Sequence, residues 1–254
     1  MKIVCLGAGN VATHLVTALY EHSIDIVQVY SRTLESASAL ANRVGAKPLT
    51  DLKEVVDNAD IYLFSLKDSV LENVMAQIPN NSGLWIHTAG SASLNIFSNY
   101  TSRYGVLYPF QTFTKNRKIN WSEIPIFVEA SDNESLNTIN IIAKQLSNKI
   151  FDLSSEERKY LHLTGVFACN FTNHMYTLSK QFLDKINLPF DVVLPLIDET
   201  ASKIHDLSPE EAQTGPAIRY DENVINKHLS LIEDDIVKQI YKIMSDNIHR
   251  ISKE

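Results

Sequence analysis

Short apolar runs alternate with amphipathic stretches along the first 152 residues of the chain. The apolar runs predict strands at Lys2–Leu6, Ile24–Tyr30, Ile61–Ser65, Leu84–His87, Val106–Leu107, Pro125–Glu129 and Lys149–Asp152. The stretches with helical periodicity predict helices at Val11–His22, Thr33–Val44, Ser69–Ile78 and Glu134–Leu146. Strands that alternate with helices are typical of a parallel sheet covered by helices. We therefore expect a doubly wound α/β domain with a parallel sheet over residues 1–152.

The pattern changes after residue 152, because only helical periodicity follows. Ser154 or Ser155 predicts a helix start, since two glutamates come next and carboxylates stabilise the positive end of a helix. The periodicity is broken at Pro189, at Ser208-Pro209 and at Gly215-Pro216. We expect an all-α C-terminal domain over residues 153–254, packed closely on the first domain so that a substrate cleft lies between them.

Composition and charge narrow the class of function. The formal net charge of -7 at pH 7 argues against nonspecific binding to nucleic acid or to an anionic membrane surface. No apolar run approaches the roughly 20 residues of a membrane-spanning helix, and the N-terminus does not resemble a secretory signal. Cys5 and Cys169 lie in apolar contexts without metal-ligand spacing, as buried thiols in a reducing compartment do. We expect a cytoplasmic protein that binds no nucleic acid, no membrane and no metal.

Residues 7–12, "GAGNVA", join the first predicted strand to the first predicted helix. In the spacing Gly7-x-Gly9-x-x-Ala12, the first glycine permits a tight turn, the second lets a pyrophosphate approach the backbone, and the alanine lets the helix pack on the strand. Asn10 and Val11 open the helix, whose free N–H groups can bind phosphates. A plain structural turn is the other interpretation. The strand before the motif and the helix after it favour a Rossmann dinucleotide site.

The end of the second predicted strand indicates which dinucleotide binds. An NAD site usually has a carboxylate there for the ribose 2′-hydroxyl, but this chain has Ser31, Arg32 and Thr33, and Asp25 comes too early. Arg32 can make paired, charge-assisted hydrogen bonds to a 2′-phosphate, and the two hydroxyls can add donors. Alternatively, Thr33 only caps the next helix and Arg32 is solvated. We favour NADP(H).

Two further strand ends are expected to line the cofactor, because ligands of such sheets bind at the carboxyl ends of the strands. Ser65, Leu66 and Lys67 follow one apolar run, and His87 and Thr88 end another. His87 and Thr88 are placed where the nicotinamide would lie, and His87 is a catalytic candidate. The alternatives are a solvated loop charge for Lys67 and a hydrogen-bonded structural pair for His87 and Thr88.

Four longer motifs carry a resemblance to a known family. They read "HTAGS" (87–91), "YPFQTF" (108–113), "ACNFTNHMY" (168–176) and "QTGPAIRYDENVINKHL" (213–229). The glycine turn with Ser31-Arg32 resembles the Rossmann domains of the 6-phosphogluconate dehydrogenase-like superfamily, which includes pyrroline-5-carboxylate reductase, ketopantoate reductase, the β-hydroxyacid dehydrogenases and the F420-dependent NADP reductases. Together the motifs are similar to the Rossmann-like proteins with a C-terminal DUF2520 domain, described as NADP oxidoreductases. The resemblance implies an N-terminal NADP-binding domain, a helical C-terminal domain and a homodimer built through those helices.

One departure from the superfamily concerns the first long helix after the Rossmann domain. The β-hydroxyacid dehydrogenases have a catalytic lysine there, whereas Leu163–Thr177 contains none and offers Asn170, Asn173 and His174. Asn170 and His174 are one helical turn apart and share a face, so they are catalytic candidates, with His174 as a proton donor. The alternative is that the asparagines cap or bridge helices while His174 packs.

The segment "TGPAIRYDENVINKH" brings many polar groups into one short loop. Thr214, Arg219 and Lys227 are candidate substrate ligands, and Arg219 could clamp a carboxylate. His228 is a further catalytic candidate. Alternatively, a pair between Arg219 and Asp221 holds the turn against a neighbouring subunit.

These residues together predict an NADPH-dependent reductase of a small carbonyl or imine substrate bound between the two domains. The missing helix lysine keeps a second hypothesis open, an NADP(H)-binding sensor or scaffold dimer with little or no catalysis. A third is hydride exchange between NADP and a deazaflavin, by analogy with the F420-dependent reductases. Fold analogy cannot separate the three.

Overall fold

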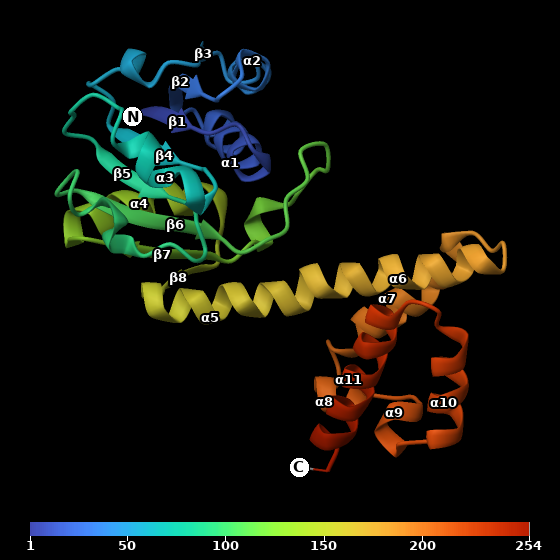
Figure 1. The fold of residues 1–254 in the computed structure, drawn as a ribbon. Helices are drawn as coiled ribbons and strands as arrows, with labels where there is room; N and C mark the ends of the chain where they lie inside the picture. Colours follow the sequence, from blue (N-terminus) through green and yellow to red (C-terminus); the bar gives the residue numbers. More distant parts are fainter. Residues whose placement is uncertain (254) are drawn as a thin grey trace. The chain divides into compact units, whose positions relative to one another are not determined.

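A computed structural model describes residues 1–253, and its first part is built on one eight-stranded sheet (Figure 1). The strands are β1 (Lys2–Leu6), β2 (Asp25–Tyr30), β3 (Lys47–Leu49), β4 (Ile61–Phe64), β5 (Leu84–His87), β6 (Tyr104–Pro109), β7 (Ile126–Ala130) and β8 (Ile150–Asp152). Their order across the sheet is β3-β2-β1-β4-β5-β6-β7-β8. Neighbouring strands are parallel except β6 and β7, which are antiparallel.

Helices connect several of the strands and make up most of the described chain after β8. They are α1 (Asn10–Glu21), α2 (Leu34–Ala41), α3 (Asp68–Met75), α4 (Asn133–Leu146), α5 (Ser155–Gly165), α6 (Thr172–Lys185), α7 (Leu194–Lys203), α8 (Pro209–Ala212), α9 (Pro216–Arg219), α10 (Glu222–Leu231) and α11 (Asp235–Ile251). Short 3₁₀ turns are η1 (Leu52–Glu54), η2 (Leu94–Phe97), η3 (Trp121–Glu123) and η5 (Phe190–Val193), and η4 (Val166–Phe171) is a π-helical turn between α5 and α6.

The sheet is covered on both faces, because successive side chains of a strand point to opposite sides. In β1, Ile3 and Cys5 join the core that includes the apolar sides of α1, α2 and α4. Val4 and Leu6 join the other core, which α3 and η2 cover. This arrangement leaves the carboxyl ends of the parallel strands free to form a ligand site.

The predicted α/β sheet followed by an all-α region is confirmed, with two corrections. Strand β3 was not predicted, because three residues that include Pro48 give no apolar run, and proline is tolerated at the edge of a sheet, where β3 lies. The sheet is also not fully parallel, since β7 runs antiparallel to β6. Strand direction depends on the connection, which apolar pattern alone does not show.

The chain forms two compact units, Met1–Met175 and the residues from Tyr176 onward. The first extends beyond the sheet because α5 belongs to it. The predicted helix start there is confirmed: Ser154 caps α5 in a capping box with Glu157. Whether a functional domain boundary lies at residue 152 stays a prediction. In the part of the chain that the structure describes, no helix is long and apolar enough to cross a membrane.

Candidate functional site

A cavity of about 800 Å³ lies at the carboxyl ends of β1, β2, β4 and β5 within the first unit. Ten of the twelve residues predicted to bind the cofactor line it: Gly7, Gly9, Asn10, Val11, Ser31, Arg32, Ser65, Leu66, Lys67 and Thr88. The other two are close in sequence but serve the fold. Ala12 is fully buried in the core under α1, and Thr33 accepts a hydrogen bond from the N–H of Ser36 as the N-cap of α2.

The two glycines of the turn differ in what they permit. Gly7 has a φ of 123°, and a Cβ there would collide with the backbone carbonyl of Ser65, so the turn itself requires glycine. Gly9 has an ordinary φ of -77°, and a Cβ there would meet no protein atom within 4 Å. That Cβ would enter the open space of the cavity. Glycine at position 9 therefore leaves this part of the cavity open for a ligand.

The start of α1 is a candidate anion site. Its N-cap, Gly9, offers no side-chain oxygen to the free N–H groups of the first turn. These N–H groups, with the positive end of the helix dipole, favour a phosphate at this position. Ser65 and Thr88, from the ends of β4 and β5, are joined by a hydroxyl–hydroxyl hydrogen bond of 3.2 Å on the wall of the same cavity.

Arg32 lies at the β2 end of the cavity and is exposed. Among the residues that the structure describes, no carboxylate forms an ion pair with it. An unpaired guanidinium with Ser31 beside it fits a 2′-phosphate. The uncapped helix start, the open space over Gly9 and this guanidinium together fit NADP.

The structure adds cavity residues that sequence reasoning missed. Thr50 and Asp51 directly follow β3. Because β3 was not predicted, its carboxyl end was not considered as part of the ligand site. Asn73 and Gln77 contribute from α3 and its C-terminal end, where a single helical turn of polar residues resembles any solvated helix face. Only the position of the cavity identifies them.

His87 is placed differently from its neighbour Thr88, because it is fully buried. Its Nδ1 accepts a hydrogen bond from the N–H of Ala89, and its ring packs 5.5 Å from that of Phe97. Burial, helped by the charge of Arg158, lowers the pKa of His87 to about 3. The imidazole is neutral at physiological pH and does not line the cavity, and the catalytic assignment of His87 stays a prediction.

Arg158 of α5 is a buried cation that sequence reasoning missed, with a side chain only 1% exposed. Its guanidinium donates to the Glu129 carboxylate at 2.7 Å and to the carbonyl of Ala92 at 2.7 Å. Glu129 also accepts the backbone N–H and the hydroxyl of Ser155. This network fixes the first turn of α5 to β7 and to the loop after β5.

The fixed α5 positions His162 beside that loop. Nδ1 of His162 lies 3.1 Å from the Tyr108 hydroxyl at the end of β6, and a Cβ on Gly90 would collide with both rings. Burial raises the pKa of Tyr108, partly offset by the charge of Arg158. The quoted motifs "HTAGS" and "YPFQTF" thus meet at α5, a juxtaposition that the sequence alone did not reveal.

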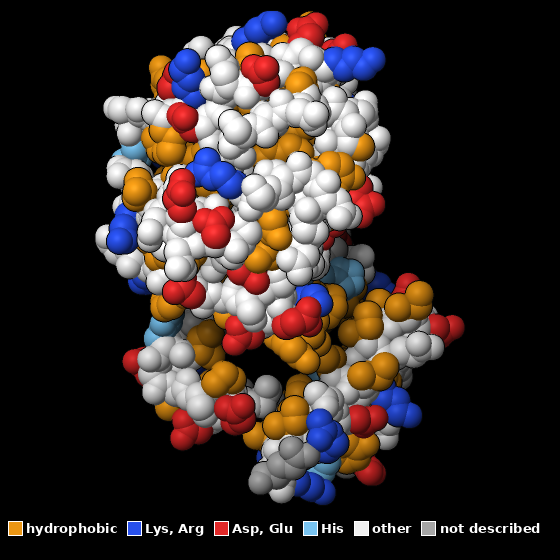
Figure 2. Space-filling model, turned by 90° about the vertical axis from the view of Figure 1, so that its left-hand side faces the viewer, with side chains coloured by type: hydrophobic (Ala, Val, Ile, Leu, Met, Phe, Trp, Pro, Cys, Tyr) orange, Lys and Arg blue, Asp and Glu red, His pale blue; other side chains and the backbone are white. Residues whose placement is uncertain are grey.

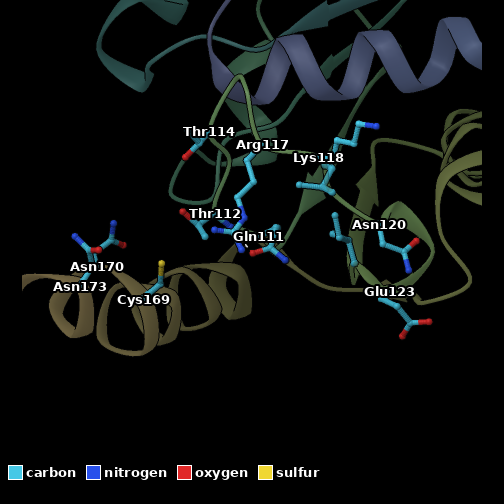
Figure 3. A pocket seen from close by; sticks show the side chains of 12 residues that line it. Gln111, Thr112, Thr114, Arg117, Lys118, Asn120, Glu123, Cys169, Asn170 and Asn173 are labelled. Carbon is cyan, nitrogen blue, oxygen red and sulfur yellow. Dashed lines mark hydrogen bonds between the residues drawn. The ribbon is translucent and has the colours of Figure 1, made fainter. Parts of the chain in front are cut away.

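Asn170 and His174 follow α5 on a helical rod formed by η4 and α6, residues 166–185. Asn170, in the π-helical turn η4, lines a second cavity of about 760 Å³ with Asn173 and Cys169 (Figure 3). His174 is exposed on α6 and does not line that cavity. The catalytic assignments of both residues stay predictions.

The remaining predicted residues belong to the second unit. Thr214, Arg219 and Lys227 lie in and after the turn at Gly215, whose φ of 107° requires glycine. Nδ1 of His228 lies 2.8 Å from the Tyr241 hydroxyl. Their roles toward substrate stay predictions. No group of three or more His, Cys, Asp or Glu side chains suited to a metal ion occurs in residues 1–253.

Comparisons with known proteins agree with this geometry. Residues 2–86 match the family described as NADP oxidoreductase coenzyme F420-dependent, and residues 124–248 match the domain of unknown function DUF2520. The crystal structure of the "putative NADP oxidoreductase" BF3122 from Bacteroides fragilis has 52% sequence identity and a TM-score of 0.92, with 98% of each chain covered. No curated protein sequence matches the chain.

More distant structures share the fold. An imine reductase from Myxococcus stipitatus in complex with NADP+ is 12% identical with a TM-score of 0.70, and the match covers 100% of this chain and 93% of that chain. The 1-pyrroline-5-carboxylate reductase of Streptococcus pyogenes is 15% identical with a TM-score of 0.63, with 98% of both chains covered. Since this chain is 52% identical to the Bacteroides protein over 98% of each chain, it belongs to the family of NADP oxidoreductases that join a Rossmann domain to a DUF2520 domain.

Proposed function

We propose that this protein uses NADPH to reduce a C=N or C=O bond of a small molecule. The observation that carries the proposal is the cavity at the strand ends, which combines an uncapped helix start, open space over Gly9 and the unpaired Arg32. In this cavity the first turn of α1 would hold the pyrophosphate, and Ser31 with Arg32 would hold the 2′-phosphate. Ser65, Lys67 and Thr88 would line the path toward the nicotinamide. Bound NADPH would supply the hydride.

The substrate class is supported by two proteins of the same fold. One is an imine reductase and the other reduces 1-pyrroline-5-carboxylate, a cyclic imine. Oxidation of NADPH, followed by the loss of its near-ultraviolet absorbance with a panel of imines, oxo acids and the deazaflavin F420, tests turnover. Binding of NADPH without oxidation by any of them would favour the sensor or scaffold hypothesis.

Arg32→Ala is expected to weaken NADPH binding by about tenfold to a hundredfold and to leave NADH binding unchanged, because only NADPH has the 2′-phosphate. Titration of cofactor fluorescence measures both affinities. Arg43→Ala is the matched control, since this exposed arginine follows α2 and does not line the cavity. Equal affinities of the unaltered protein for NADPH and NADH would contradict the assignment of Arg32.

We also propose that the second unit pairs with a second copy of the chain. Among its described residues only three hydrophobic side chains are buried, Leu178, Ile225 and Ile232. Many large ones are exposed, including Ile186 at 64%, Leu196 at 65% and others on α6, α7, α10 and α11. Figure 2 shows hydrophobic side chains spread over the surface of this helical part. So much exposed apolar surface supports an interface.

The dimer is tested on α11, where Ile236 and Ile243 are 68% and 65% exposed and lie on one helix face. Light scattering at micromolar concentration is expected to give the mass of a dimer for the unaltered chain and of a monomer for Ile243→Glu. Ile141→Glu, at a 60% exposed position of α4 in the first unit, is the control and is expected to stay dimeric. A monomeric unaltered protein would exclude the proposed pairing.

A further inference from the structure

The second cavity of the first unit is formed by the loop after β6 and by the helical rod (Figure 3). The loop contributes residues between Gln111 and Ile124, and the rod contributes Cys169, Asn170 and Asn173. Side-chain amides and one guanidinium therefore face a space of about 760 Å³, enough for a small organic molecule.

Arg117 and Lys118 supply the positive charge of this cavity. Figure 3 shows the Arg117 side chain running toward Gln111 and Thr112, across from Cys169 and Asn170. Lys118 lines the cavity as well, but only the planar guanidinium of Arg117 can make two parallel hydrogen bonds to one carboxylate. Within the described chain no acidic side chain pairs with Arg117, and the one carboxylate on the rim, Glu123, is bound to Lys149 at 2.7 Å. The cavity is thus cationic in a protein whose net charge is negative.

The backbone of the facing helix is an independent sign of a site. Residues 166–171 form a π-helical turn, and the hydroxyl of Thr172, directly after it, donates to the carbonyl of Phe167 five residues earlier. Such turns interrupt a helix at a cost and occur frequently at functional sites. Here the turn presents Cys169 and Asn170 to the cavity. Asn170 brings an amide that can donate to a carboxylate or carbonyl oxygen.

The cavity lies on the same edge of the sheet as the cofactor cavity. Strand β6 runs parallel to β5, so Gln111 and Thr112 follow a carboxyl end beside the one that presents Thr88. The loop is also tied to α1, because Nε2 of His14 lies 2.8 Å from the carbonyl oxygen of Thr114. His14 is one helical turn after Asn10, which lines the cofactor cavity.

We propose that this cavity binds the carboxylate of the substrate, with Arg117 as the bidentate partner and Asn170 as an added donor. The substrates are then carboxylates that carry the reducible C=O or C=N bond, such as 2-oxo acids or cyclic imino acids. This inference rests on the proposed reductase function. The arginine that binds the carboxylate is then Arg117 of the first unit and not Arg219, which the sequence suggested for this role.

The test compares Arg117→Gln with Lys115→Gln, which removes one positive charge from the same loop at an exposed residue that does not line the cavity. Pyruvate, 2-oxoglutarate and phenylpyruvate, each beside its methyl ester, are the probes. Ligand-observed NMR with NADP+ in place of NADPH measures binding without turnover, and NADPH oxidation measures turnover. The acids are expected to bind more tightly than their esters, and Arg117→Gln is expected to weaken acid binding about tenfold or more. Acid binding by Lys115→Gln and NADPH binding by Arg117→Gln are expected to stay unchanged.

The outcomes separate this inference from the function on which it rests. If the unaltered protein binds no acid more tightly than its ester, or if Arg117→Gln and Lys115→Gln have the same effect, the carboxylate site is wrong even when NADPH binds and neutral substrates are reduced. If NADPH itself does not bind, the reductase function fails first. If Arg219→Gln weakens acid binding and Arg117→Gln does not, the carboxylate is bound by Arg219 in the second unit.

Discussion

Arg158→Met is expected to lower the free energy of unfolding of the first unit by about 3 to 5 kcal/mol, because it leaves a largely buried carboxylate without its partner. The Glu129 side chain is only 19% exposed, so water replaces the lost guanidinium poorly. The carbonyl of Ala92 loses its donor at the same time. Methionine keeps much of the side-chain volume, so the loss is mainly one of charge and hydrogen bonds.

Tryptophan fluorescence during urea denaturation measures this change for the first unit alone. The chain has two tryptophans, Trp85 and Trp121, and both lie in that unit. Adding Glu129→Gln to Arg158→Met is expected to restore part of the stability, since the double variant leaves no buried charge uncompensated. A loss below about 1 kcal/mol for Arg158→Met would mean that the pair behaves as an exposed one.

The burial of Arg158 could not be predicted from the sequence. In "SSEERKYL" Arg158 is one charge among several at a helix start, and such charges are ordinarily solvated. Its burial depends on β7 and on the loop after β5, which are distant in sequence and lie against α5 only in the folded chain. The contact between Tyr108 and His162 was missed for the same reason. Long-range pairing of polar side chains has no local pattern.

The local features were predictable because each has its own signal. Alternating apolar runs gave seven of the eight strands of the described sheet, and the eighth, β3, was too short and contained Pro48. The glycine turn and Ser31-Arg32 led to the cofactor cavity, because strand ends of a parallel sheet must meet at one edge. Thr50 and Asp51 were missed as cavity residues because β3 was not predicted. The substrate side was the hardest to predict, since Arg117 sits in a loop without periodicity.

Gly9→Ala is expected to weaken NADPH binding by at least about a hundredfold and to leave the fold intact, because the new methyl group occupies space that only the cofactor would use. The φ of Gly9 suits alanine, and no protein atom lies within 4 Å of the added carbon. The melting temperature without cofactor is therefore expected to stay the same or to rise slightly, since alanine restricts the unfolded chain. Cofactor fluorescence and a thermal melt measure the two effects separately.

Gly7→Ala is the matched variant, with the same added carbon two residues earlier in the same turn. It is expected to lower the melting temperature, because its φ of 123° and the carbonyl of Ser65 leave no room for a Cβ. The pair therefore separates a glycine that the fold needs from one that the ligand needs. If Gly9→Ala bound NADPH as tightly as the unaltered protein, the pyrophosphate could not lie over the start of α1, and the cavity would have to hold the cofactor in another way or hold something else.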